Sequence, residues 1–140
     1  MNDLLNRLVK KNISETMNLN SEDTVYKIEI IRKIEDEPVL FETTYLPTKR
    51  FKNFETIDLN KKALYDILRY DYNVNFSNAK QTFYPVLASN IVKKYLDANI
   101  KEPLACMNVE RISYENENIV EYTIALVKGE KFRYSIDLKN

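Results

Sequence analysis

The sequence predicts an α+β fold in which helices flank an antiparallel sheet of about six strands. Six stretches show strand character, several of them alternating apolar and polar residues with a period of two. Turn residues separate neighbouring strands, and only two internal segments show the spacing of three and four residues that is typical of an amphipathic helix. At 140 residues, the chain has the size of one domain with one core.

The N-terminal residues 1–22 are polar and predict a linker or N-terminal extension, so the domain itself is expected at residues 23–140. Within this extension, Leu4, Leu5, Leu8 and Val9 form a weak apolar stripe that predicts a short helix.

The next segment predicts a β-hairpin. From Thr24 to Ile34 the apolar residues Tyr26, Ile28 and Ile30 alternate with charged ones. Glu35-Asp36-Glu37-Pro38 has the composition of a turn, and a second strand then runs over residues 39–46.

The middle of the chain predicts two helices separated by a strand. Asn60 is a candidate cap for a helix at about 61–70, in which Leu64, Ile67 and Leu68 share one face. A strand is expected over 74–84. Pro85 is then expected in the first turn of a helix that ends near Asp97.

The last third predicts a three-stranded meander. Strands are expected at residues 104–114 and 119–127, joined by a turn at Glu115-Asn116-Glu117-Asn118. After a tight turn at Lys128-Gly129, the alternation of Phe132, Tyr134, Ile136 and Leu138 predicts a third strand.

The composition excludes several classes of function. The chain has no histidine, which removes the commonest general base and the commonest transition-metal ligand, so we expect no metal, no cofactor and no enzyme activity. A single glycine cannot build a Walker or Rossmann phosphate loop. The 21 basic and 21 acidic residues cancel, which disfavours DNA binding by this chain alone. The one cysteine, Cys106, is expected in the core of a cytoplasmic protein that does not span a membrane.

Three charged residues interrupt strand faces that are otherwise apolar. They are Arg32, Glu42 and Glu121, and burying an unpaired charge is costly unless a partner is present. One interpretation is that Arg32 pairs internally with Glu42 or Glu121, or that the face is partly solvent-exposed at a sheet edge. The other is that the three side chains line a pocket for a polar, partly anionic ligand.

Several segments are similar, in the same order, to the signature segments of the UTRA domain, the effector-binding half of GntR-type regulators of the HutC subfamily. Residues 37–47 (EPVLFETTYLP) resemble the signature "gePva.e.sYlP", and residues 63–68 (ALYDIL) resemble the helix "SLYdlL". Ala79-Lys80-Gln81 resembles "A.Q", and the stretch from Pro103 to Arg111 resembles "pLl.i.R". Val120-Glu121-Tyr122 and residues 128–134 resemble the ending "vEyt…yrgdryrf".

The resemblance implies a fold like that of chorismate lyase, a homodimer, and a role in transcription regulation, as in a repressor. DNA would be bound only through a winged helix-turn-helix domain, which is absent from this chain. The resemblance also implies that Arg32, Glu42 and Glu121 contact the effector. Thr44, Gln81 and Val127, from the same signature segments, complete the expected ligand-binding set.

The expected effector is a small polar metabolite, such as a sugar, a sugar phosphate, an amino acid or a small organic acid. The chain has Ile30-Ile31-Arg32 in place of an Arg-x-Arg motif, Ala63 in place of a serine and Val127 in place of a tyrosine. These departures remove donors that a phosphate dianion needs. Two alternatives stay open, a lyase-type enzyme on the same fold and a dimerisation module with a vestigial pocket.

Overall fold

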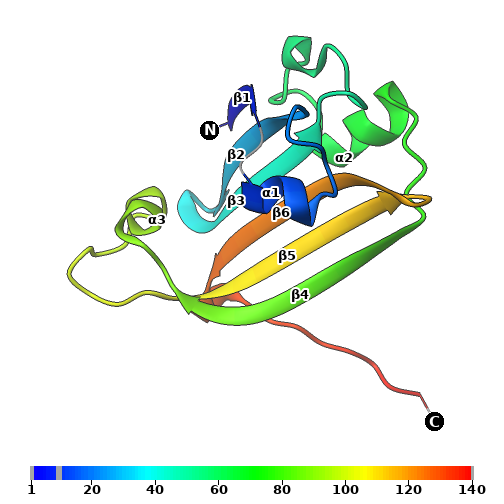
Figure 1. Ribbon diagram of the computed structural model, residues 1–140. Coiled ribbons are helices and arrows are strands. Elements are labelled where there is room, and N and C mark those ends of the chain that lie inside the picture. Colours follow the sequence, from blue (N-terminus) through cyan, green and yellow to red (C-terminus); the bar gives the residue numbers. More distant parts are fainter. Residues whose placement is uncertain (1, 9–10, 140) are drawn as a thin grey trace.

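The computed structural model describes the backbone of residues 2–8 and 11–139, with side chains from residue 13 onward. Its centre is one antiparallel sheet with the strand order β1-β2-β3-β6-β5-β4 (Figure 1). This arrangement confirms the predicted α+β class. The strands are β1 (Asn2–Leu8), β2 (Thr24–Ile34), β3 (Glu37–Pro47), β4 (Asn78–Leu87), β5 (Ala105–Glu115) and β6 (Asn118–Lys128).

Short helical segments connect and cover the strands (Figure 1). The α-helices are α1 (Lys11–Thr16), α2 (Leu64–Asp66) and α3 (Asn90–Tyr95); the other helical turns are η1 (Phe54–Thr56), the π-helical η2 (Ile67–Asp71) and η3 (Gly129–Lys131). Among the described residues, no helix is long and apolar enough to cross a membrane.

Both predicted hairpins are confirmed. β2 pairs with β3 across a two-residue turn, in which Glu35 and Asp36 have φ angles of 51° and 66°. Two successive left-handed residues produce the twist that suits a tight hairpin. β5 pairs with β6 in the same antiparallel manner.

The core lies on both faces of the sheet, because alternate residues of a strand point to opposite sides. On one face, Tyr26 and Ile28 of β2 pack with Ile67 and Leu68 of η2. On the other face, Met17, which directly follows α1, packs on Val25 and Tyr122, and α3 packs on Phe41 and Cys106. The sheet is therefore covered by α1 and α3 on one side and by the η1–η2 region on the other.

The N-terminal prediction is wrong in its secondary structure. Residues 2–8 form strand β1, which pairs with β2 from Asn2↔Ile30 to Leu8↔Thr24. The expected helical stripe therefore lies in a strand, apart from Val9, which is outside the described residues. Pairing with the long edge of β2 overrides the weak helical spacing.

Two boundaries in the middle of the chain also differ from expectation. The helix expected from Asn60 begins only at Leu64 with Ala63 as its cap residue, although Ile67 and Leu68 are buried as predicted. Pro85 does not begin a helix; it lies within β4, which is an edge strand and tolerates a missing N–H donor. The helix begins instead after Ser89, whose hydroxyl accepts a bond from the Val92 N–H.

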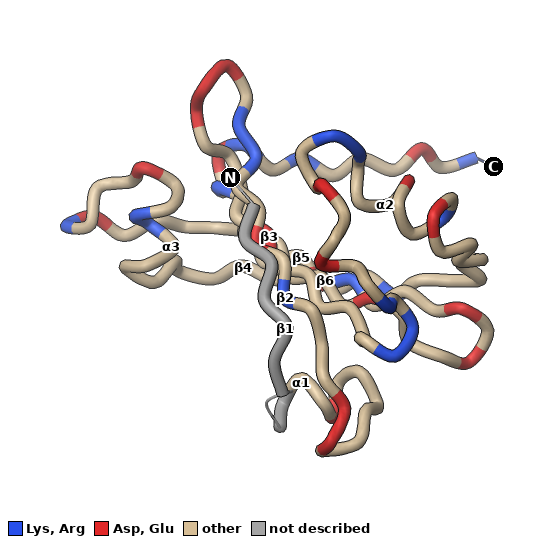
Figure 2. Tube along the Cα trace, turned by 90° about the horizontal axis from the view of Figure 1, so that it is seen from above, with Lys and Arg blue, Asp and Glu red and all other residues tan. Residues whose placement is uncertain are grey.

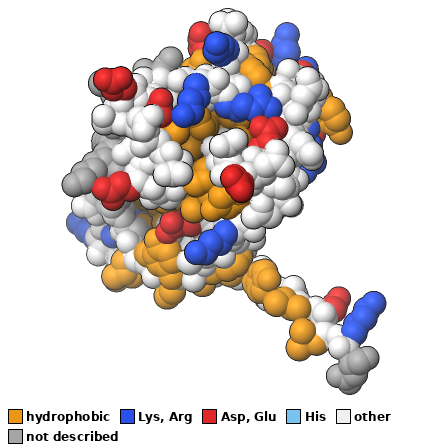
Figure 3. Space-filling view, turned by 45° about the vertical axis from the view of Figure 1, so that its right-hand side comes forward, with side chains coloured by type: hydrophobic (Ala, Val, Ile, Leu, Met, Phe, Trp, Pro, Cys, Tyr) orange, Lys and Arg blue, Asp and Glu red, His pale blue; other side chains and the backbone are white. Residues whose placement is uncertain are grey.

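The third strand of the predicted meander is absent. After η3, residues 132–139 have no regular secondary structure and extend away from the body of the molecule (Figures 1 and 3). Phe132 and Tyr134 contact the Phe83 ring of β4, whereas Ile136 and Leu138 are exposed. The period-two pattern is present, but no described strand of this chain pairs with it.

Charged residues are dispersed along the described part of the Cα trace, with basic and acidic positions interspersed (Figure 2). Two basic segments each contain a buried residue. Lys93 is buried, and its ammonium donates to the Ile100 carbonyl at 3.2 Å. In the run Lys49-Arg50-Phe51-Lys52, Phe51 is a fully buried core residue. Cys106 is buried, as predicted, and burial raises the pKa of its thiol.

Candidate ligand-binding site

The Glu121 carboxylate is the centre of a buried polar network. It is 0% exposed, and both of its oxygens accept hydrogen bonds. The Ser113 hydroxyl donates to Oε1 at 2.6 Å, and the Tyr65 hydroxyl donates to Oε2 at 2.8 Å. Arg111 adds an ion pair of 3.1 Å from Nη2 to Oε2, and Thr123 also donates to Oε2. A buried carboxylate needs this many partners to offset its desolvation.

Strand register brings these side chains together. Ser113 of β5 lies opposite Glu121 of β6, and Arg111 lies opposite Thr123. On the other side of β6, Thr44 of β3 lies opposite Thr123, and their hydroxyls are 2.8 Å apart. Because cross-strand partners point to the same face, all five residues lie on one side of the sheet.

Tyr65 and Arg111 connect this network to the helical segment that covers the sheet. The Arg111 guanidinium carbon lies 4.8 Å from the centre of the Tyr65 ring. Burial and the neighbouring Glu121 carboxylate raise the pKa of the Tyr65 hydroxyl. Burial opposes the charge on Arg111, but the hydrogen bonds from Arg111 to Glu121 are strong enough to raise the pKa of Arg111. Arg111 is therefore a fixed cation above a buried carboxylate.

An open cavity of about 470 Å³ lies beside Arg111. Two aromatic rings, those of Tyr65 and Phe76, meet edge to face at 5.6 Å on its wall. The guanidinium carbon of Arg69 lies 5.6 Å from the centre of the Phe76 ring, and Arg69 forms no ion pair with the acidic side chains that the structure describes. The lining residues are Tyr65, Arg69, Phe76, Ser77, Asn78, Ala79, Arg111 and Ser113.

The cavity is suited to a small anion. It is lined by two arginines, and no acidic residue is among its lining residues. Arginine presents five N–H donors, and Glu121 engages only Nε and Nη2 of Arg111, so part of this guanidinium stays available. Forked donors match a carboxylate or a phosphate, while the aromatic wall can contact a flat or apolar part of a ligand.

The six site residues expected from the sequence do not form one group in the structure. Arg32 and Glu42 form an ion pair of 3.5 Å, with side chains 56% and 16% exposed. Thr44 and Glu121 are joined through Thr123 in the buried network. The strand register places Gln81 opposite Arg111 and Val127 opposite Leu40. Glu42 also acts electrostatically on Tyr65 and Arg111, so it lies near the network. None of the six is a lining residue of the cavity.

The sequence-based site did not include the residues that line the cavity. Arg111 lies on the same face of β5 as Met107 and Val109, so the same period-two count could have identified it as a charge on an apolar face. Tyr65 and Ala79 lie within the "SLYdlL" and "A.Q" segments. Arg69, by contrast, lies on η2, where strand counting gives no signal.

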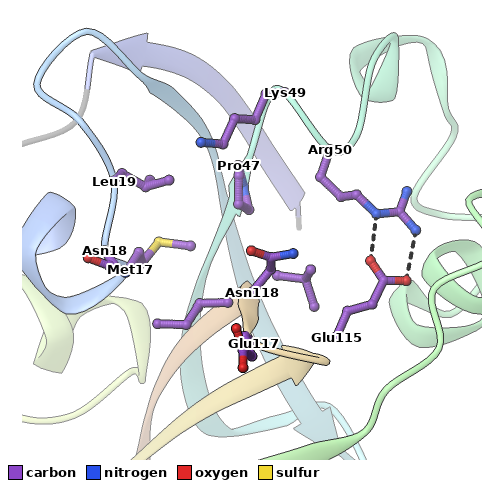
Figure 4. A pocket seen from close by; sticks show the side chains of 11 residues that line it. Met17, Asn18, Leu19, Pro47, Lys49, Arg50, Glu115, Glu117 and Asn118 are labelled. Atoms are coloured by element: carbon purple, nitrogen blue, oxygen red, sulfur yellow. Dashed lines mark hydrogen bonds and ion pairs between the residues drawn. The ribbon is translucent and has the colours of Figure 1, made fainter.

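A second cavity, of about 270 Å³, lies where Met17 and Leu19 face the ends of β3 and β6 (Figure 4). Its charged side chains are mostly paired, since Arg50 and Glu115 form a two-bonded ion pair at 2.9 and 3.1 Å. Lys49 contacts Asp23 at 3.3 Å. This cavity therefore offers a ligand less unpaired charge than the cavity beside Arg111. No group of His, Cys, Asp and Glu suited to a metal ion occurs among the described residues.

Comparison with known proteins agrees with this architecture. The sequence pattern of the UTRA domain matches residues 5–133, which is most of the chain. The chain belongs to the UTRA domain family. The match begins within the stretch expected to be a linker, where the structure has β1 and α1.

Relatives of this UTRA domain include bacterial transcription regulators. The chain is 23% identical over 128 residues to YurK of Bacillus subtilis, an HTH-type transcriptional regulator; the match covers 91% of the chain and 52% of YurK. The chain thus spans about half the length of this curated relative.

Solved structures share the fold of this UTRA domain. The C-terminal domain of YurK has a TM-score of 0.86 at 22% identity, over 99% of this chain and 93% of that one. A GntR-family regulator from Enterococcus faecalis gives 0.84 at 22% identity, over 99% and 100%. The effector domain of PhnF from Mycobacterium smegmatis gives 0.87 at 17% identity, over 99% and 86%.

Proposed function

We propose that this UTRA domain is the effector-binding domain of a cytoplasmic GntR-type transcription regulator and that its effector is a small anionic metabolite. The observation that carries the proposal is the cavity beside Arg111, lined by two arginines and two aromatic rings and by no acidic residue. The similarity to the effector domain of PhnF from Mycobacterium smegmatis supports the same role.

The charge balance of the cavity narrows the effector class. Arg69 and Arg111 together offer about the number of donors that one carboxylate or one phosphate group uses. Ser77 and Asn78 add hydroxyl and amide groups at the rim for sugar or amino acid substituents. Small organic acids, amino acids and monophosphorylated sugars fit this description better than neutral sugars do.

The proposed regulator acts as a homodimer that binds DNA through a separate domain. The net charge of zero gives this chain little attraction for DNA phosphates, so effector binding must alter DNA affinity indirectly. A role in binding rather than catalysis follows from a carboxylate, Glu121, that is fully engaged by its neighbours and cannot serve as a general base.

The proposal is tested by thermal unfolding of the chain with a panel of carboxylates, amino acids, sugars and sugar phosphates. A ligand at 100 times its dissociation constant adds about 2.7 kcal/mol to the free energy of unfolding, which raises the melting temperature by several degrees. We expect a shift with at least one anion. A panel that gives no shift at millimolar concentration would contradict the proposal.

Two exposed arginines provide matched variants for this test. Arg69→Ala removes a cation from the cavity, and we expect it to abolish the shift. Arg32→Ala removes a cation from the site predicted by strand counting. Arg32 does not line the cavity, so we expect this variant to keep the shift. If the shift is lost with Arg32→Ala and retained with Arg69→Ala, the ligand lies at the β2–β3 side of the sheet and not in this cavity.

A further inference from the structure

The C-terminal segment of residues 132–139 (hereafter the tail) has the sequence of a strand but no partner strand in this chain. Its apolar residues alternate strictly with Arg133, Ser135, Asp137 and Lys139. The first two, Phe132 and Tyr134, contact the Phe83 ring with centroids 5.9 and 5.2 Å apart. The segment then leaves the body: Tyr134 and Ile136 are each 62% exposed, and Leu138 is 89% exposed. Strands of this composition are stable when one face is covered.

The strand nearest to the tail offers a free edge. β4 is the last strand of the sheet and pairs on one side only, with β5, among the strands that the structure describes. Its backbone N–H and C=O groups on the other side have no strand partner. Phe83, Tyr84 and Leu87 of β4 are also exposed, and Figure 3 shows apolar side chains along the tail, away from the body. β4 is ten residues long, and an uncovered edge of this length can pair with a strand of another chain.

We propose that the tail of one copy of this chain adds as an antiparallel strand to the free edge of β4 in a second copy, and that the exchange is reciprocal. The inference rests on the homodimer of the proposed function and names the segment that forms it. The occupant is the tail of a second copy because each chain carries one unpaired strand segment and one unpaired edge. A two-fold pair uses both at once, so that the exchange closes at two copies.

The tail does not pair with β4 of its own chain. Phe132 and Tyr134 contact β4 only through the Phe83 ring, and Ile136 and Leu138 belong to none of the apolar clusters of their own chain. In the reciprocal arrangement, the Phe83 rings of both copies lie near the two-fold axis, and the last four residues of each tail cover the partner's edge.

Sedimentation equilibrium of the full chain and of two matched variants tests the exchange. Ile136→Asp places a charge on the tail, and Ile34→Asp places the same charge at the end of β2; the two isoleucines are almost equally exposed, at 62% and 63%. We expect Ile136→Asp to weaken the dimer by about a hundredfold, because each dimer contains the site twice, and Ile34→Asp to leave it unchanged. A dimer that tolerates Ile136→Asp overturns the exchange but leaves the homodimer. A full chain that stays monomeric at high micromolar concentration overturns both the exchange and the homodimer. Effector binding is tested independently, by the shift in melting temperature.

A mixing experiment separates exchange between copies from addition of the tail to its own sheet. A chain ending at Lys131 has an open edge and no tail; none of the three apolar clusters includes a tail residue, so its core is intact. Phe83→Asp in the full-length chain keeps the tail and damages the edge. Each is expected to be monomeric alone, and the mixture is expected to form heterodimers. A mixture that stays monomeric while the full chain dimerises would contradict the exchange.

Discussion

At the scale of single residues, Glu121 determines whether the site is assembled. Its carboxylate is buried and holds Arg111, Tyr65, Ser113 and Thr123 in place. An amide at this position accepts through one oxygen only and presents an N–H₂ group to side chains that are themselves donors. It also leaves the Arg111 cation without its counter-charge.

We therefore expect Glu121→Gln to lower the free energy of unfolding by about 3 kcal/mol, as is typical of breaking a buried ion pair from one side. Urea denaturation at pH 7 measures this. Glu42→Gln is the matched control, because its partner Arg32 is 56% exposed and their ion pair is long, at 3.5 Å, so the loss should be less than about 1 kcal/mol. Equal losses in the two variants would show that the Glu121 network does not stabilise the fold.

The sequence identifies some of these residues and not others for a physical reason. Period-two counting finds a charge on an apolar strand face, which is how Glu121 was recognised. It cannot tell which partner neutralises that charge, because the partner is set by the register of neighbouring strands. Glu121 pairs with Arg111 across β5–β6, while Arg32 pairs with Glu42, one of the two glutamates expected as its partner.

At the scale of elements, one ion pair fastens the β5–β6 turn to the segments that cover the sheet. Glu115 at the end of β5 accepts two bonds from Arg50, which follows β3, and one from the Asn75 N–H. Arg50 also donates to the Tyr72 carbonyl just beyond η2, at 2.9 Å. Three segments distant in sequence therefore meet at one carboxylate.

This pair predicts a pH dependence of stability. Hydrogen bonding from Arg50, opposed by partial burial, holds the pKa of Glu115 below its ordinary value of 4.5. A carboxyl whose pKa is lower in the folded state stabilises the fold above its unfolded pKa, and this contribution is lost as the pH falls through the folded pKa. We expect Glu115→Gln to cost about 2 kcal/mol at pH 7 and progressively less below pH 4. Chemical denaturation of both chains across this range measures the difference, and curves that stay parallel down to acid pH would exclude this role.

Elements with strong local signals were predicted well, and elements set by tertiary pairing were not. The β2–β3 hairpin has clear alternation and turn residues, and its strands were located within a residue or two. The prediction of a helix at β1 is wrong because its partner residues in β2 lie 16 to 28 positions further along the chain, and local spacing cannot reveal such a pairing. Pro85 suits both a helix start and an edge strand, and only the sheet order decides between them.

At the scale of the whole molecule, the sheet separates two tasks. The face that carries Glu121 and Arg111 holds the cavity beside the η2 segment, and the β4 edge with the tail offers a surface for a second copy. Asn78 and Ala79 of β4 line the cavity, so the proposed ligand site and the proposed dimer edge share this strand. A ligand that reorders this strand could thereby change how two copies are joined.

The central claim is that the effector occupies the cavity beside Arg111, and an added fluorophore tests it most directly. The chain contains no tryptophan, so Phe76→Trp places a single indole on the cavity wall. Tyr70→Trp, at an exposed position outside the cavity lining, is the control. Titration with the anion that raises the melting temperature should change the emission of the Phe76→Trp chain until it saturates. The midpoint should equal the one that calorimetry gives for the unsubstituted chain, and the emission of the control should not change. Calorimetric binding to the Phe76→Trp chain without any change in its emission would place the ligand elsewhere and contradict the account.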